Sequence, residues 1–198
     1  MNMAKRVFII HGWSGSPLEA WIPWLKAELQ KEEFRVSAPS MPDPDRPRIS
    51  TWVKAVGGAV GRPDGDTFFV GHSIGCQTIL RYLQAFDEVP NVGGNVLVAP
   101  WTRLTAAAYG DAEDRDIANE WLNTAIQWER LSNNRFITIF SDNDPLVPLS
   151  EARVFMDKLR AKVIIKKKAG HLGGESGIKM LPEALRSVLE MASTHKSL

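Results

Sequence analysis

The chain has 198 residues, 44% of them hydrophobic, and its 24 Lys and Arg residues nearly balance its 23 Asp and Glu residues. This length and composition predict a single domain, residues 1–198, with enough apolar side chains for a core. The net charge of +1 argues against nucleic-acid binding, which normally needs a basic face. The single cysteine excludes an internal disulfide and a cysteine-based zinc site.

The sequence shows no membrane or export signal. Its longest purely apolar runs, such as Val7–Ile10 and Val96–Ala99, have about four residues. A membrane-spanning helix needs roughly 18, so we expect no membrane partner. The N-terminal residues lead directly into a predicted strand without the apolar segment of a signal peptide. Together with a single cysteine, which suits a reducing compartment, this pattern predicts a cytoplasmic protein.

Strand-like runs alternate with helical patterns along the whole chain. Six runs rich in β-branched and aromatic residues predict strands: Arg6–Ile10, Phe34–Ala38, Thr67–Val70, Asn95–Ala99, Arg135–Phe140 and Lys162–Lys167. Between them, apolar residues recur at helical spacing in four stripes. The stripes are Leu18, Ile22, Leu25 and Leu29; Cys76, Ile79, Leu80 and Leu83; Ala152, Phe155, Met156 and Leu159; and Leu181, Leu185, Val188 and Leu189. This alternation is typical of a doubly wound α/β protein, whose parallel sheet is covered by helices on both faces.

One segment interrupts the alternation. Residues Trp101 to Leu131 contain no predicted strand, and an apolar pattern begins at Ile117. Before it lies an acidic cluster, which consists of Asp111, Glu113, Asp114 and Asp116. The segment is either a long crossover with one helix or a small lid over the functional site.

The sequence Gly71-His72-Ser73-Ile74-Gly75 directly follows the predicted strand Thr67–Val70 and precedes a helical stripe. A Gly-x-Ser-x-Gly pattern between a strand and a helix is typical of a nucleophile elbow, a strained turn that exposes the serine hydroxyl. Glycines are needed there because side chains would collide with the strand and the helix. Ser73 is therefore the candidate nucleophile; the alternative is an ordinary glycine-rich turn with an N-cap serine.

A serine nucleophile needs a base, and His171 follows the last predicted strand, where an α/β-hydrolase presents its base. The other histidines are placed less favourably: His11 and His72 belong to other turn motifs, and His195 lies near the C-terminal end. The alternative for His171 is an ordinary surface-loop histidine.

The acid that orients the histidine is expected after the strand Arg135–Phe140. Two aspartates lie there, and we favour Asp144 over Asp142 because Pro145 fixes the backbone beside it, whereas Asp142 suits an Asx turn. The resulting order Ser, Asp, His along the chain is the one that α/β-hydrolases use. Each residue follows a different strand, and open parallel sheets gather their sites at these carboxyl ends.

The turn His11-Gly12-Trp13-Ser14-Gly15 follows the first predicted strand and suits an oxyanion hole. We expect the backbone N–H groups of Trp13 and Ile74 to be its donors. The His11 side chain is expected to fix this loop by hydrogen bonding rather than to act in catalysis. Candidate substrate-binding residues are His11, Gly12, Trp13 and Trp101.

Five segments occur in an order and spacing that resemble one known family. They are Phe8-Ile9-Ile10-His11-Gly12, Trp21-Ile22-Pro23-Trp24-Leu25, Met41-Pro42-Asp43-Pro44, Val70–Cys76 and Asp144-Pro145-Leu146-Val147-Pro148. Together they resemble the small serine hydrolases of the retinoblastoma-binding protein 9 and YdeN-like family over essentially the whole chain. The resemblance implies a minimal α/β-hydrolase with sheet order 2-1-3-4-5-6, a triad of Ser73, Asp144 and His171, and activity on short acyl esters. The Leu-x-Cys-x-Glu motif associated with retinoblastoma-protein binding is absent, so that partner is not expected.

The sequence therefore predicts a cytoplasmic serine hydrolase that cleaves small acyl esters through an acyl-enzyme, with no cofactor and no metal. Two alternatives stay open. One is a thioesterase or peptidase that uses the same three residues; the other is a non-catalytic member of the fold that binds a ligand or a protein. We expect a small-molecule acyl substrate, and the sequence names neither the natural substrate nor a protein partner.

Overall fold

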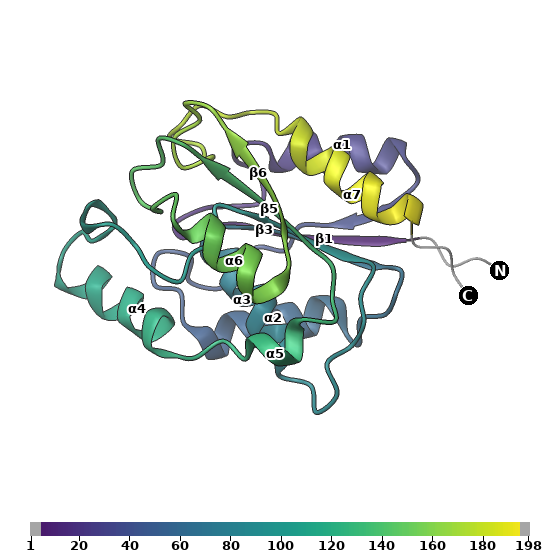
Figure 1. The fold of residues 1–198 in the computed structure, drawn as a ribbon, viewed down its shortest axis with the longest axis horizontal. Coiled ribbons are helices and arrows are strands. Elements are labelled where there is room, and N and C mark those ends of the chain that lie inside the picture. Colours follow the sequence, from purple (N-terminus) through teal and green to yellow (C-terminus); the bar gives the residue numbers. More distant parts are fainter. Residues whose placement is uncertain (1–4, 195–198) are drawn as a thin grey trace.

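Six parallel strands form one sheet in the computed structural model, which describes residues 5–194 (Figure 1). Their order is β2-β1-β3-β4-β5-β6, which confirms the predicted order. The strands are β1 (Arg6–Ile10), β2 (Arg35–Ser37), β3 (Thr67–His72), β4 (Gly94–Val98), β5 (Phe136–Ser141) and β6 (Lys162–Lys166). His195 lies outside the described residues.

The strand ends differ from the sequence-based ranges by at most two residues. The largest difference is in β3, which continues past Val70 to His72. Gly71 and His72 still pair with β4, so the strand extends into the Gly-x-Ser-x-Gly motif itself. This pairing sets the direction in which the chain enters the turn at Ser73.

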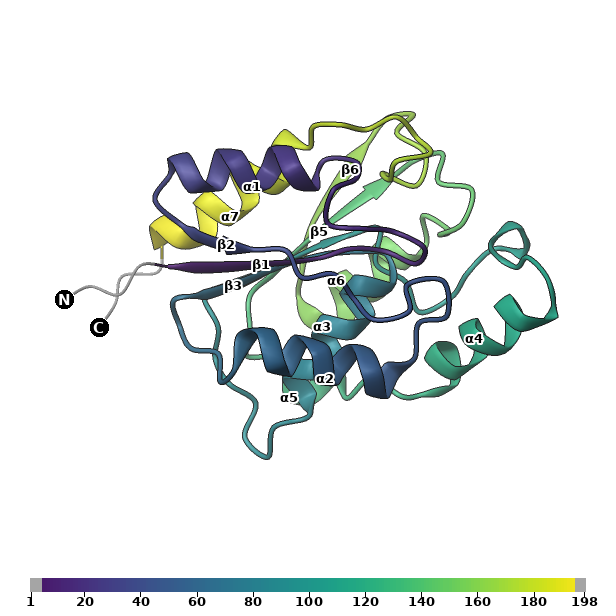
Figure 2. The ribbon, with the colours of Figure 1, turned by 180° about the vertical axis from the view of Figure 1, so that it is seen from behind.

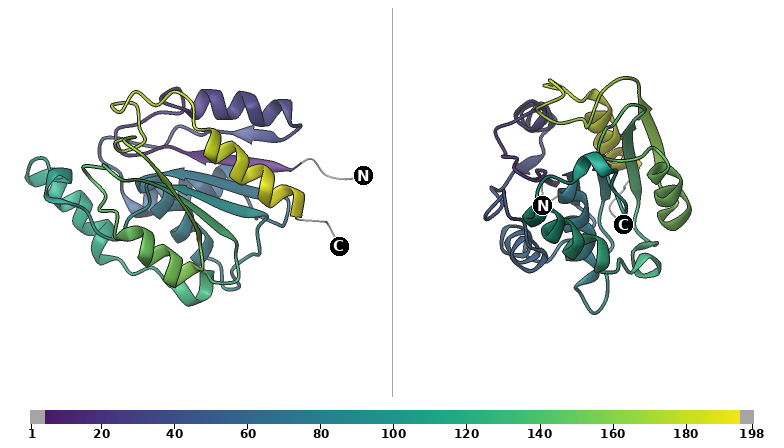
Figure 3. Two further views of the ribbon diagram at one scale, coloured as in Figure 1. Left: turned by 45° about the horizontal axis from the view of Figure 1, so that its top comes forward. Right: turned by 90° about the vertical axis from the view of Figure 1, so that its left-hand side faces the viewer.

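Helices cover both faces of the sheet, as the sequence predicts (Figures 1 and 3). They are α1 (Ile22–Lys31), α2 (Ile49–Val60), α3 (Ile74–Gln84), α4 (Ala112–Asn123), α5 (Trp128–Leu131), α6 (Glu151–Leu159) and α7 (Pro182–Thr194). The alternation along β1 separates two cores: Val7 and Ile9 pack with α1 and α7, whereas Phe8 and Ile10 pack with α2 and α3. Because successive side chains of a strand point to opposite faces, the central strands are buried on both sides.

Two positions of the predicted helical stripes are wrong. Leu18 is 83% exposed and precedes α1, which begins at Ile22. The buried side chain just before α1 is Trp21. Met156 is 41% exposed. It follows the buried Phe155 by one residue, a rotation of about 100° around the helix, and so it faces solvent.

The segment 101–131 contains a short 3₁₀ turn (Ala106–Ala108), α4 and α5. Contacts with the loop before α2 hold α4 in place: Trp121 Nε1 donates to the Pro47 carbonyl oxygen at 2.9 Å, and Arg48 pairs with Glu120 at 3.0 Å. Figure 2 shows α4 beside this loop, at the end of the molecule where the strands terminate. The segment is therefore anchored next to the expected site.

Within residues 5–194, no helix is both long enough and apolar enough to cross a bilayer. The same residues do not bring three or more His, Cys, Asp or Glu side chains together in a way that would hold a metal ion.

Candidate active site

Ser73 lies in the sharp turn between β3 and α3. Its φ of +52° and ψ of −117° are unusual for a residue other than glycine, and such a conformation costs on the order of 1–3 kcal/mol. A hydrogen bond of 2.8 Å from the Ser73 N–H to the Val98 carbonyl oxygen holds the turn. The chain also packs too closely for a side chain at Gly75, whose Cβ would overlap the Ile10 carbonyl oxygen. The surrounding structure thus fixes the strained turn that the Gly-x-Ser-x-Gly pattern predicts.

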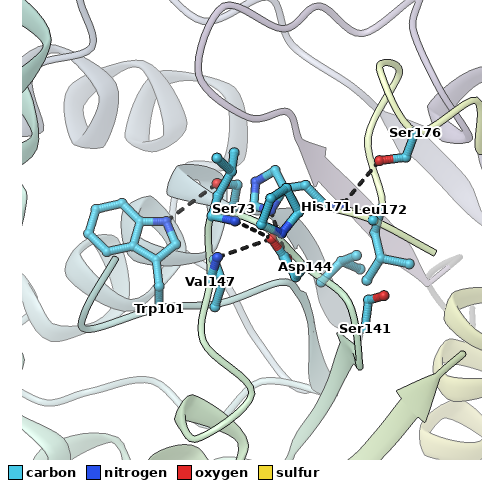
Figure 4. Close-up of polar contacts among 12 residues, drawn as sticks. Ser73, Trp101, Ser141, Asp144, Val147, His171, Leu172 and Ser176 are labelled. Carbon is cyan, nitrogen blue, oxygen red and sulfur yellow. Dashed lines mark hydrogen bonds and ion pairs between the residues drawn. The ribbon is translucent and has the colours of Figure 1, made fainter. Parts of the chain in front are cut away.

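Figure 4 shows His171 and Asp144 in direct contact. His171 Nδ1 donates to Asp144 Oδ2 at 2.8 Å, and the two side chains are only 7% and 3% exposed. The other Asp144 oxygen accepts the backbone N–H groups of Leu146 and Val147 at 2.8 and 3.0 Å. Because a carboxylate only accepts hydrogen bonds, this contact keeps a proton on Nδ1 and leaves Nε2 as the basic nitrogen.

The neighbouring acid, Asp142, has a different partner. Three consecutive side chains at the C-terminal end of β5 accept hydrogen bonds from three consecutive backbone N–H groups of residues 168–173, which we call the base loop. The pairs are Asp142 with Lys168 (2.7 Å), Ser141 with Ala169 (3.0 Å) and Asn143 with Gly170 (2.9 Å). Asp142 therefore shapes the base loop, and Asp144 is the carboxylate that contacts His171, as the position of Pro145 predicts.

The His72 side chain, which precedes Ser73 in the nucleophile elbow, forms a hydrogen bond with the base loop. Its Nε2 lies 2.9 Å from the His171 carbonyl oxygen. Burial, together with the nearby His171 ring, lowers the pKa of His72 to about 3. The ring is therefore neutral, and Nε2 carries the proton because a carbonyl oxygen can only accept. From the sequence, His72 is expected only as part of a turn, and its place beside Ser73 in the elbow is the one signal that indicates this role.

The Ser73 hydroxyl has its own partner in this structure. The Trp101 Nε1–H donates to Ser73 Oγ at 3.3 Å, and the indole is 1% exposed (Figure 4). Among residues 5–194 no hydrogen bond joins Ser73 to His171, although both line the same cavity. Contacts between a nucleophile and its base often tighten only when substrate binds. The indole contact uses only the acceptor capacity of Oγ, so the Ser73 O–H stays free to donate to another group.

A cavity of about 270 Å³ lies over Ser73. Three of the candidate substrate-binding residues, Gly12, Trp13 and Trp101, line it. The segment 101–131 supplies further wall residues, which are Leu104, Ala108 and Asp114. The segment thus connects β4 to β5 and also forms part of the cavity wall. The lid interpretation stays a prediction.

His11 does not line this cavity, which corrects its place among the candidate substrate-binding residues. The ring is 2% exposed, and both of its nitrogens contact the backbone. Nδ1 donates to the Gly12 carbonyl oxygen at 2.8 Å, and Nε2 accepts the Met41 N–H at 3.0 Å. Burial lowers the pKa of His11, consistent with a neutral ring that fixes the loop.

The expected oxyanion donors, Trp13 and Ile74, both line the cavity. Within the described part of the chain, neither backbone N–H donates a hydrogen bond. Ile74 is the first residue of α3, where backbone N–H groups have no acceptor within the helix. Gly12 allows its loop to approach the elbow, because a Cβ there would lie 2.8 Å from His72 Nδ1. The two N–H groups are therefore available to an oxyanion beside Ser73.

Known proteins resemble this chain over nearly its whole length. The sequence model of the family described as Serine hydrolase matches residues 7–190. Putative hydrolase YdeN from Bacillus subtilis is 26% identical over 182 residues, which cover 91% of this chain and 92% of that protein. The crystal structure of the ydeN gene product from B. subtilis superposes with a TM-score of 0.87 at 24% identity, covering 96% of this chain and 100% of the other. Carboxylesterase CesB from B. subtilis shares the fold, with a TM-score of 0.61 at 14% identity over 96% of this chain and 84% of the other.

Proposed function

Since the chain belongs to the serine hydrolase family, we propose that it hydrolyses small acyl esters through an acyl-enzyme formed on Ser73. The observation that carries this proposal is the buried hydrogen bond of 2.8 Å between His171 and Asp144, because His171 lines the same cavity as the strained Ser73. A histidine whose Nδ1 proton is held by a carboxylate is the arrangement that activates a serine.

In the first half of the reaction, Ser73 Oγ attacks the ester carbonyl carbon and its proton passes to His171 Nε2. Asp144 stabilises the resulting imidazolium through Nδ1. The N–H groups of Trp13 and Ile74 bind the oxyanion of the tetrahedral intermediate. When this intermediate collapses, the bond to the leaving oxygen breaks, and Nε2 returns the proton to the departing alcohol.

In the second half, water releases the acyl group. His171 Nε2 accepts a proton from the water as its oxygen attacks the acyl carbonyl carbon. The bond to Ser73 Oγ then breaks, and Nε2 returns the proton to that oxygen. The products are the carboxylic acid and the free enzyme.

A fluorophosphonate probe tests whether Ser73 is activated. We expect the probe to form one covalent adduct on Ser73, located by mass spectrometry of the digested protein, because phosphonylation requires an activated nucleophile. Denatured protein is the control and stays unlabelled. A native protein that binds small esters reversibly but takes no label would contradict the proposal and support the non-catalytic alternative. Parallel rates on matched oxygen esters, thioesters and anilides separate the esterase from a thioesterase or a peptidase.

Acyl chain length is the second expectation. The cavity of about 270 Å³ has apolar walls at Trp13, Trp101, Leu104 and Leu146. Each buried methylene contributes roughly 0.8 kcal/mol, but only until the pocket is full. We therefore expect kcat/KM to be highest for p-nitrophenyl esters with acyl chains of about two to four carbons. A palmitate ester cleaved as efficiently as the acetate or butyrate would show that the segment 101–131 opens into a lipase-like groove.

A further inference from the structure

The acidic cluster before and within α4 separates into residues with different partners. Asp111 caps the helix by accepting the Asp114 N–H at 3.0 Å, and Glu113 pairs with Arg46 at 2.8 Å. The Asp114 side chain instead lines the cavity over Ser73. One acidic side chain of the cluster is thus part of the candidate active site.

A second carboxylate lines the same cavity from a segment nearer the C-terminus. Glu175 lies just after the base loop and lines the cavity with His171. Asp114 and Glu175 come from separate segments, so the proximity of the two acids to the nucleophile arises only in the folded protein.

Glycines leave room for both carboxylates. A Cβ on Gly110 would overlap the Asp114 carboxylate, and a Cβ on Gly173 would lie 3.1 Å from both Glu175 oxygens. Each carboxylate therefore lies close to a glycine of its own loop; Asp114 is half-buried there, and Glu175 is exposed at the rim of the cavity.

Nothing in the described cavity neutralises these charges. No lysine or arginine is among its lining residues, and no ion pair joins Asp114 or Glu175 to a lysine or arginine within residues 5–194. His72, which also lines the cavity, is neutral because burial lowers its pKa to about 3. Asp144 is already paired with His171. The substrate therefore meets an excess of negative charge beside Ser73.

The walls of the cavity also suit a weakly hydrated cation. Trp13 and Trp101 contribute indole rings, and Leu104 and Leu146 contribute apolar surface. Aromatic faces attract cations, and tryptophan is the strongest of them; cages of aromatic rings and acids recognise quaternary ammonium groups in other proteins. A hard, strongly hydrated anion would gain nothing from these walls and would be repelled by the two carboxylates.

We propose that this site prefers acyl esters that carry a quaternary ammonium group near the scissile bond. The inference rests on the proposed esterase function and adds the charge class of its substrate. The two carboxylates attract the cation over several ångströms, and the half-buried Trp13 indole contacts its methyl groups.

Two pairs of substrates test the preference. Within each pair, the charged and the neutral ester have the same shape and differ only in the atom at the centre of the quaternary group. The first pair is butyrylcholine and the dimethylbutyl butyrate in which carbon replaces the quaternary nitrogen, with the charge on the alcohol side. The second pair consists of p-nitrophenyl esters of a trimethylammonio-butyric acid and its carbon analogue, with the charge on the acyl side. We expect kcat/KM for the charged member of at least one pair to be about tenfold higher at low salt, and this ratio to fall toward one at about 0.5 M NaCl.

Substitutions assign the preference to the carboxylates. Asp114→Asn and Glu175→Gln, alone and combined, should reduce the charged-to-neutral ratio of kcat/KM, a ratio that is unaffected by any loss of activity common to both esters. Asp116→Asn is the matched control, because Asp116 is an exposed acid of α4 that does not line the cavity. This control should keep the wild-type ratio.

The outcomes separate this inference from the proposed function. Equal rates within both pairs, or a preference that persists in the double variant, would overturn the charge preference while esterase activity stands. Failure of the wild-type protein to cleave any neutral ester would instead overturn the proposed function.

Discussion

Replacing Ser73 with alanine is expected to lower kcat for ester hydrolysis by about 10⁴–10⁶. The variant loses the oxygen that forms the acyl-enzyme, while the His171–Asp144 pair and the oxyanion donors remain. Some activity above the uncatalysed rate can therefore persist, because binding and electrostatic stabilisation do not need the serine. Steady-state kinetics with p-nitrophenyl acetate measures the loss.

The fold should survive this substitution. Alanine keeps the Cβ, so it has the same backbone preferences as serine at φ +52°, and the 2.8 Å hydrogen bond from residue 73 to Val98 uses only backbone atoms. We expect an unchanged circular dichroism spectrum and a Tm close to that of the wild type. Retention of even a tenth of the wild-type activity would show that Ser73 is not the nucleophile.

Replacing Asp144 with asparagine is expected to lower kcat by roughly 10⁴. An amide can donate as well as accept, so the imidazole is free to adopt the wrong tautomer, and the developing imidazolium loses its negative partner. The two backbone N–H groups that Asp144 accepts can still bond to the amide oxygen, which limits the structural damage.

Asp142→Asn is the matched comparison in the same loop. Its partner is the Lys168 N–H, which an asparagine oxygen can also accept, so we expect a loss of no more than about threefold in kcat. Parallel measurements of kcat and Tm on the two variants distinguish the roles. A large loss for Asp142→Asn and a small one for Asp144→Asn would make Asp142 the acid and contradict the geometry.

The fold could be predicted because its strands are continuous apolar runs separated by helical stripes. Such runs are expected only where a strand is buried on both faces, and this is what β3 and β4 show. Details at the surface could not be predicted in the same way. Leu18 fits the helical spacing, but Pro23 occupies the first turn of α1 and the chain before it turns away. Helix α2 is not among the four predicted stripes, although its buried residues Trp52, Val56 and Val60 have helical spacing.

The site could be predicted in part for a topological reason. Ser73, Asp144 and His171 follow three different strands, and the carboxyl ends of parallel strands meet at one edge of the sheet. The groups that support them could not be inferred, because their roles depend on tertiary contacts. Trp21 shows this: its Nε1 donates to the Leu172 carbonyl oxygen at 2.8 Å, 151 residues away in the chain. No local pattern indicates such a contact.

The way the base loop is held has a consequence for folding. His72 reaches the loop across 99 residues of sequence, and Asp144 meets His171 across 27. Contacts between such distant residues depend on strand pairing to bring their loops together, so we expect them to form late in folding. An intermediate that lacks the pairing of β5 with β6 cannot hold the base, however complete its helices are. Catalytic competence is therefore a property of the fully folded chain, and it should disappear as soon as the C-terminal strands separate.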